Sequence, residues 1–187
     1  LQQGFKPVHW CVNCRSALAE AEVEYIDKVS SAIDVRFSVI DEEDFLSRIH
    51  AAAGCGPIII PIWTTTPWTL PANEAVALNP EIDYVLVQTA SERFLIAESL
   101  LSVCMQRYHI TDYKRLGGST GKVFEDLVLQ HPFYHRQIPI ILGEHVTLEA
   151  GTGAVHTAPA HGIEDYSIAQ KYGLPLINPV DGNGCFL

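Results

Sequence analysis

A run of hydroxyl side chains at the end of an apolar segment is the first feature of this sequence that could do chemistry. Residues 63–73 read Trp-Thr-Thr-Thr-Pro-Trp-Thr-Leu-Pro-Ala-Asn and follow a run rich in isoleucine. The pattern predicts a buried strand that leads into a proline-stiffened loop. The hydroxyls of Thr64, Thr65 and Thr66 could hydrogen-bond a small substrate without carrying charge. Threonine is also a common strand residue, and the pattern alone leaves that interpretation open.

A second polar group lies in residues 151–166, which read Gly-Thr-Gly-Ala-Val-His-Thr-Ala-Pro-Ala-His-Gly-Ile-Glu-Asp-Tyr. The order predicts a strand, a tight turn and a helix start, so two histidines and two carboxylates gather where backbone N–H groups converge. Each residue also has a purely structural explanation. Glu164 and Asp165 complement the helix dipole, and His156 fits a hydrogen-bonded core histidine.

Three kinds of hydrolytic chemistry can be compared with these residues. His156, His161 and Asp165 are ligand types for zinc or iron, but their spacing is not that of a His-Glu-x-x-His helix. Covalent catalysis is weaker, because the chain has no Gly-x-Ser-x-Gly turn and no cysteine in a context that lowers its pKa. The remaining option is attack by a positioned water on an already activated bond, such as an ester.

The cysteines indicate a reducing compartment. Cys11 and Cys14 have the spacing of a zinc knuckle but supply only two of the four ligands of a structural site, so we expect the other two outside this chain. Cys55, Cys104 and Cys185 are scattered and the total of five is odd, which argues against a secreted disulfide framework. We expect a cytoplasmic protein.

The elements that must position these residues are mainly strands. Short β-type segments separated by Gly, Pro and Asn favour a closed or nearly closed barrel, and we expect peripheral helices where the spacing is helical. The expected strands are 57–65, 74–78, 84–89, 94–97, 123–129, 138–142, 145–148 and 153–157. The expected helices are 43–52, 98–108 and 163–172.

Composition sets the size and charge of the molecule. The chain has 187 residues, of which 48% are hydrophobic and 18% charged, enough for one domain with a substantial core. A net charge of -10 argues against a surface that coats a phosphate backbone, and no apolar run is long enough to cross a membrane. Leu1 in place of methionine suggests a piece of a longer protein. Residues 1–35 differ in character, so we expect an appendage there and the barrel in 36–187.

Residues 63–73 and 151–166, together with the opening segment 7–25, resemble the signature stretches of the connective-peptide editing domain of isoleucyl-tRNA synthetase. The resemblance spans nearly the whole chain. Valyl and leucyl relatives carry Thr-Thr-Arg-Pro where this chain has Thr-Thr-Thr-Pro. The synthetic site of that class is marked by His-x-Gly-His and Lys-Met-Ser-Lys-Ser, and neither occurs here, so we expect no aminoacylation by this chain.

The resemblance implies a role for each matching residue. Asp165 would bind the α-ammonium of the aminoacyl group, and His156 would border the side-chain pocket and exclude isoleucine. Thr64, Thr65 and Thr66 would line the site and hold substrate and water. Further substrate-binding residues would be Trp63, Trp68, Thr69, Asn73 and His161. No metal or cofactor is implied.

The implied function is hydrolysis of valine from tRNA(Ile), and also of valyl-adenylate, by a monomeric part of a larger synthetase. One methylene gives about 1 to 3 kcal/mol of discrimination, a general figure for which isoleucyl-tRNA synthetase is itself the usual example. A second pocket that admits valine and blocks isoleucine adds a second sieve. Two alternatives stay open: a metal-dependent hydrolase built on His156, His161 and Asp165, and a non-catalytic module that binds an amino acid or a tRNA end.

Overall fold

The computed structural model describes residues 7–187 and consists mostly of strands. The strands of the main sheet are β3 (Ile33–Val39), β4 (Ile58–Thr64), β5 (Ala75–Leu78), β6 (Asp83–Gln88), β7 (Arg93–Ala97), β8 (Lys114–Thr120), β9 (Val128–Gln130), β10 (Gln137–Leu142) and β11 (Ala154–Thr157). The helices are α1 (Glu42–Ile49), α2 (Leu101–Arg107) and α3 (Ile163–Tyr172), and the 3-10 turns are η1 (Glu20–Glu22), η2 (Pro67–Ala72), η3 (Glu98–Leu100) and η4 (Gly121–Phe124).

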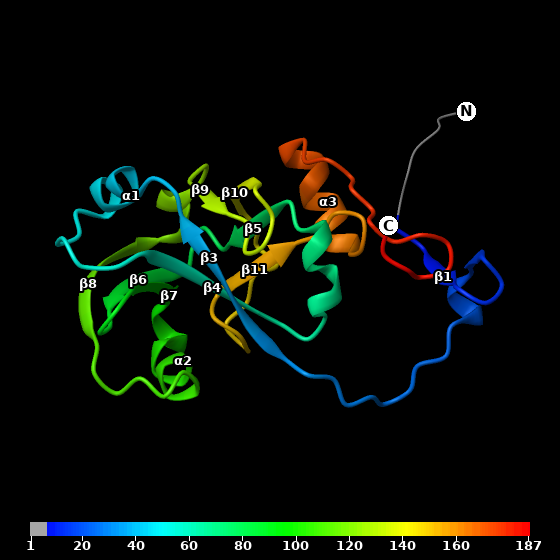
Figure 1. Ribbon diagram of the computed structural model, residues 1–187, viewed down its shortest axis with the longest axis horizontal. Coiled ribbons are helices and arrows are strands. Elements are labelled where there is room, and N and C mark those ends of the chain that lie inside the picture. Colours follow the sequence, from blue (N-terminus) through cyan, green and yellow to red (C-terminus); the bar gives the residue numbers. More distant parts are fainter. Residues whose placement is uncertain (1–6) are drawn as a thin grey trace.

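The nine strands form one mixed sheet in the order β11-β5-β10-β9-β3-β4-β7-β6-β8. Two pairs are parallel, β10 with β5 and β4 with β7, and the others are antiparallel. The sheet curls, so that β11 lies beside β4 although the two are far apart in strand order (Figure 1). The Thr152 hydroxyl, just before β11, links the two strands by donating to the carbonyl of Pro61 in β4 at 2.6 Å. The expectation of a mainly β, barrel-like core with peripheral helices is confirmed.

The core forms where strands are apolar on both faces. Strand β4 is buried almost throughout, because it lies between β3 and β7 in the middle of the sheet. Helix α1 packs against the sheet through Phe45, whose ring stacks on Phe124 with centroids 5.2 Å apart. Asp41 caps this helix by accepting from the N–H of Asp44 at 2.9 Å. This rigid interior fixes the end of β4, where the threonines lie.

Several expected elements differ from the observed ones. The expected strand 123–129 is wrong over residues 123–127, where η4 and a turn with Asp126 at φ +65° precede β9. The expected strand 145–148 is also wrong, because these residues form a loop. Strands β3 and β8 were not expected, and β8 carries two glycines where strand propensity is low. Helix α1 ends at Ile49 because His50 is left-handed, and α3 has the expected bounds.

The N-terminal part forms a separate hairpin, β1 (His9–Cys11) with β2 (Ser16–Leu18). Figure 1 shows this hairpin beside the C-terminal segment at one end of the molecule, away from α1 and α2. The indole N–H of Trp10 donates to the carbonyl of Gly182 at 3.0 Å. Within residues 7–187, no helix has the length and hydropathy needed to span a membrane.

Candidate functional site

The three successive threonines lie where β4 leaves the sheet. Thr64 is buried, whereas Thr65 and Thr66 are exposed, and the Thr64 hydroxyl lies 3.3 Å from that of Thr66 and accepts the Thr66 N–H at 3.0 Å. The carbonyl of Thr65 accepts from the hydroxyl of Ser30 at 2.8 Å, which ties the extended segment before β3 to this loop. The hydroxyls therefore form a folded loop rather than a continued strand.

The threonine loop meets the histidine segment directly. Thr69, on η2, lies with its hydroxyl 3.1 Å from Nε2 of His156, and it donates its single hydrogen to the carbonyl of Thr66 at 2.9 Å. His156 must then carry its proton on Nε2 and donate to Thr69. This leaves Nδ1 as a bare acceptor, and Nδ1 is buried without a partner in the described part of the chain. A small ligand with a donor group could satisfy it.

His156 is held neutral by its surroundings. The residue is 8% exposed, and burial, together with smaller contributions from His161 and His131, lowers its pKa to about 4. An imidazole in this state can border an apolar pocket without bringing a charge into it.

This buried histidine makes folding stability depend on pH. The folded-state pKa of about 4 lies below the ordinary histidine value of 6.5, so protons bind the unfolded chain more tightly. The stability is fully present above pH 6.5 and is lost as the pH falls from 6.5 toward 4, by about 3 kcal/mol for this group. We expect His156→Gln to flatten that dependence in urea unfolding curves. His135→Gln, at an exposed histidine, is the matched control, and equal slopes for all three proteins would contradict the assignment.

Asp165 lies in the first turn of α3 and faces back toward the strand end. Its Oδ2 accepts the N–H of Ala158 at 2.9 Å, which folds the turn between β11 and α3. Burial raises the pKa of Asp165, and the Ala158 N–H, His145 and His161 oppose the rise while Glu164 adds to it. Because burial disfavours the ionised form of this carboxylate, a cationic partner would stabilise it more than it would an exposed carboxylate.

The other expected residues lie near the end of β4 or in the turns that follow β4 and β11. The rings of Trp68 and His161 make an edge-to-face contact with centroids 5.2 Å apart, and Trp68 is 52% exposed. Asn73 is fully buried, and its Nδ2 donates to the carbonyl of Ala75 at 2.8 Å and approaches that of Thr157 at 3.5 Å. Trp63 is half-buried. The structure thus brings the threonine loop and the histidine segment together through Thr69 with His156 and through Trp68 with His161.

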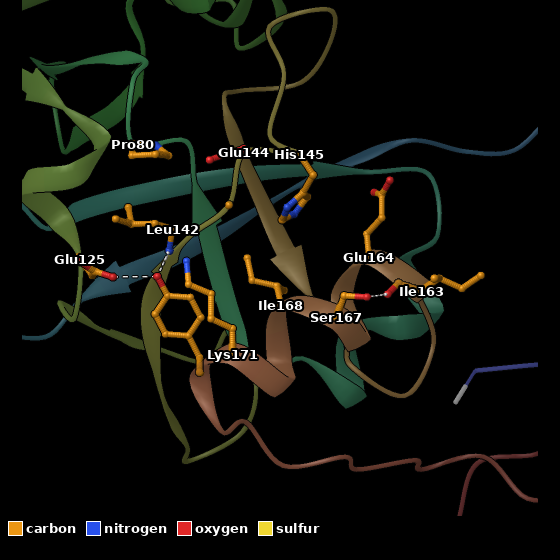
Figure 2. Close-up of a pocket in the computed structure, with 12 residues that line it drawn as sticks. Pro80, Glu125, Leu142, Glu144, His145, Ile163, Glu164, Ser167, Ile168 and Lys171 are labelled. Carbon is orange, nitrogen blue, oxygen red and sulfur yellow. Dashed lines mark hydrogen bonds between the residues drawn. The ribbon is translucent and has the colours of Figure 1, made fainter. Parts of the chain in front are cut away.

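His145 was not among the expected site residues, yet it lies beside them. It lines a hollow of about 300 Å³ that Thr64 and Thr65 also line, and it lowers the pKa of Asp165. Its other side borders a larger cavity of about 700 Å³ against α3, where Glu164 and Lys171 lie (Figure 2). The sequence pattern placed His145 at the start of an expected strand, 145–148, and so did not mark it as a site residue, whereas the structure has a loop there. The loop passes close to Gly143, where a Cβ would lie 2.3 Å from the imidazole Cε1 of His145.

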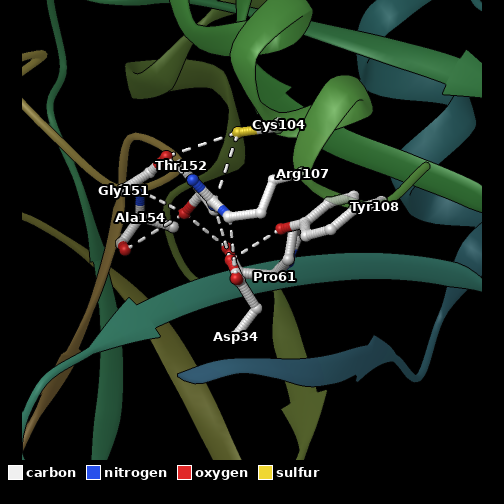
Figure 3. A network of polar contacts seen from close by, with 8 residues as sticks. All are labelled: Asp34, Pro61, Cys104, Arg107, Tyr108, Gly151, Thr152 and Ala154. Atoms are coloured by element: carbon white, nitrogen blue, oxygen red, sulfur yellow. Dashed lines mark hydrogen bonds and ion pairs between the residues drawn. The ribbon is translucent and has the colours of Figure 1, made fainter. Parts of the chain in front are cut away.

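The loop that carries His145 is anchored at its far end by a polar network (Figure 3). Arg107 pairs with both carboxylate oxygens of Asp34, at 2.8 and 2.6 Å, and also reaches the carbonyl of Gly151 at 3.4 Å. The Cys104 thiol contacts the same carbonyl at 3.3 Å, and the Tyr108 hydroxyl donates to Asp34 at 2.8 Å. Helix α2 and strand β3 thereby hold the loop against the hollow.

The histidines and carboxylates do not form a metal-binding group. Within residues 7–187, no set of three or more His, Cys, Asp or Glu side chains is arranged to hold a metal ion. His156, His161 and Asp165 are thus not arranged as a three-ligand site, and Nε2 of His156 is already bound to Thr69. In the zinc-knuckle pair, the N–H of Cys14 donates to the sulfur of Cys11 at 3.3 Å.

The fold and the family match define a synthetase editing domain. The family described as "Leucyl-tRNA synthetase, editing domain" matches residues 30–184, and the chain belongs to that family. The solved editing domain of the Plasmodium falciparum cytosolic leucyl-tRNA synthetase has a TM-score of 0.64 at 14% identity, over 76% of this chain and 67% of that one. The corresponding domain of Plasmodium knowlesi also has a TM-score of 0.64, at 12% identity, over 78% and 66%. Both show the fold.

Within the family, the chain is similar over its whole length to isoleucine–tRNA ligases. It is 59% identical to that of Legionella pneumophila strain Paris, over 100% of this chain and 20% of the ligase. It is 57% identical to that of Methylococcus capsulatus, with the same two shares. The chain therefore spans about a fifth of the length of these relatives and corresponds to their connective-peptide editing domain.

Proposed function

We propose that this chain hydrolyses valine from misacylated tRNA(Ile), and valyl-adenylate as a second substrate, by means of a positioned water. Asp165 binds the α-ammonium, and His156 closes the side-chain pocket against isoleucine. Thr64, Thr65 and Thr66 line the site and hold the ester and the water. Trp63, Trp68, Thr69, Asn73 and His161 support the bound substrate.

The observation that carries this proposal is the contact between Thr69 and His156 at 3.1 Å. It links the threonine loop to the histidine segment through two residues that are 87 positions apart in the sequence. The Asp165 carboxylate binds the N–H of Ala158, two residues after His156. Burial disfavours its ionised form, and a bound cation would offset that cost. An aminoacyl ester presents that cation next to an already activated bond, so water needs positioning more than activation.

The test measures hydrolysis of Val-tRNA(Ile) and Ile-tRNA(Ile) by the full-length protein that carries this chain. We expect deacylation of the valyl ester at a rate that exceeds that of the isoleucyl ester by about tenfold or more. The rate should be unchanged by chelator treatment that leaves the zinc knuckle of the full-length protein loaded, since no three-ligand group is present among residues 7–187.

Each alternative predicts a different outcome. A chelator-sensitive rate that returns with added metal would favour a metallohydrolase. Valine binding without release of free tRNA would favour a non-catalytic module. Equal rates on both esters would contradict the sieve.

The partners we propose are the 3′ end of tRNA(Ile) and the rest of a larger synthetase, of which this domain forms a monomeric part in the cytoplasm. The surface charge of -10 fits this arrangement, because an acidic domain needs help from other parts of the protein to hold RNA. We propose residues 1–35 as an appendage at the base of the domain and 36–187 as the editing barrel. Strand β3 begins at Ile33, so the first residues of the main sheet lie just before that boundary. The knuckle of Cys11 and Cys14 then completes a zinc site only with ligands from the parent chain.

A further inference from the structure

The turn that carries Thr69, η2, is contacted by two side chains of a single loop. The loop, residues 131–136, connects β9 to β10. Nε2 of His131 lies 3.1 Å from the carbonyl of Leu70. Arg136 reaches the next carbonyls of the same turn through Nη2, that of Pro71 at 3.3 Å and that of Asn73.

Turn η2 has few internal donors, because Pro67 and Pro71 have no N–H. Within the turn, the Asn73 N–H donates to the Leu70 carbonyl at 3.0 Å. The loop adds donors from outside, so that the Leu70 carbonyl accepts a second hydrogen bond, from His131. Nδ1 of His131 accepts the N–H of Tyr134 at 3.2 Å, and the two rings stack with centroids 5.0 Å apart. Because Nδ1 is an acceptor, Nε2 carries the proton and donates to Leu70.

Arg136 is fixed as firmly as His131. Its Nη1 donates to the carboxylate of Glu74 at 2.8 Å, and the Glu74 side chain is only 7% exposed. The guanidinium also lies over the ring of Tyr134, 5.6 Å from the centroid. A planar guanidinium can span an acid and two carbonyls at once, which a lysine cannot do.

We propose that His131 and Arg136 are positioning residues that set the distance between Thr69 and His156, and with it the size limit of the pocket. Leu70 directly follows Thr69, so a shift of its carbonyl moves the hydroxyl that holds His156. The two residues do not contact the substrate or the water, and they act by holding η2 in place. This inference rests on the proposed editing function and adds the residues that tune its selectivity.

Discrimination between the two esters separates this role from general support of the fold. In the full-length protein, His131→Phe keeps an aromatic ring in the cluster but removes the donor to Leu70. Arg136→Lys keeps the charge opposite Glu74 but cannot span both carbonyls. We expect each variant to lower the ratio of kcat/KM for Val-tRNA(Ile) over Ile-tRNA(Ile) by about tenfold, the effect of one lost hydrogen bond. His131→Gln, which retains a donor, should recover most of the ratio.

The control is His135→Phe, the same substitution at an exposed histidine of the same loop. An unchanged ratio in folded His131→Phe and Arg136→Lys would overturn the proposal, and if His131→Phe does not fold, Arg136→Lys decides. The second readout is the ring-nitrogen NMR signal of His156 in the unliganded protein. We expect it to shift in the two variants and not in His135→Phe. Should the wild-type protein fail to hydrolyse Val-tRNA(Ile), the editing proposal fails, and this signal still decides whether the positioning occurs.

Discussion

Asp165→Asn should lower the deacylation of Val-tRNA(Ile) by about 100-fold or more, because it removes the negative charge that binds the α-ammonium. Asparagine keeps an oxygen that can accept the N–H of Ala158, so the turn between β11 and α3 stays folded and only the charge is lost. Asp165→Ala removes both and should abolish activity. Single-turnover hydrolysis with the full-length protein measures both effects.

Glu164→Gln is the matched control, since Glu164 is the neighbouring carboxylate in the same helical turn and is exposed. It should retain nearly all activity. The raised pKa of Asp165 gives a second check, because activity should fall on acidification at a higher pH than for an ordinary carboxylate. Full activity in Asp165→Asn would refute the anchor.

The second large effect is expected at the pocket wall. His156→Ala should allow Ile-tRNA(Ile) to be hydrolysed about 10- to 100-fold faster, because removal of the buried ring opens more space than one methylene requires. Hydrolysis of the valyl ester should change much less. The experiment compares both esters with wild-type protein and with His135→Ala, whose histidine is exposed. If isoleucine stays protected in a folded variant, a steric role for His156 is wrong.

Local patterns predicted the parts of the fold that depend on local sequence. Helix α3 has the expected bounds because acidic residues, a helical repeat and a terminal glycine all lie within its own segment. Strand β4 was visible as an apolar run. Strand β8 was not, because its pairing with β6 holds a glycine-containing segment that local propensity disfavours.

The site shows the same limit. Thr69 and His156 were singled out from separate segments, but only the curled sheet shows that they touch. His145 and His131 lie in loops, where neither spacing nor polarity separates a positioned side chain from a solvated one. Their roles follow from their neighbours in the fold: His145 lies against Gly143, and His131 contacts the Leu70 carbonyl of η2. Contacts of this kind depend on tertiary structure, and local patterns in a single sequence do not predict them.

A structure of this protein with a non-hydrolysable valyl-adenosine analogue would test the proposed substrate site. We expect the ammonium within hydrogen-bonding distance of the Asp165 carboxylate, the valine side chain against the ring of His156, and the ester beside Thr64 to Thr66. A ligand bound elsewhere, or bound in this place with its ammonium turned away from Asp165, would contradict the account.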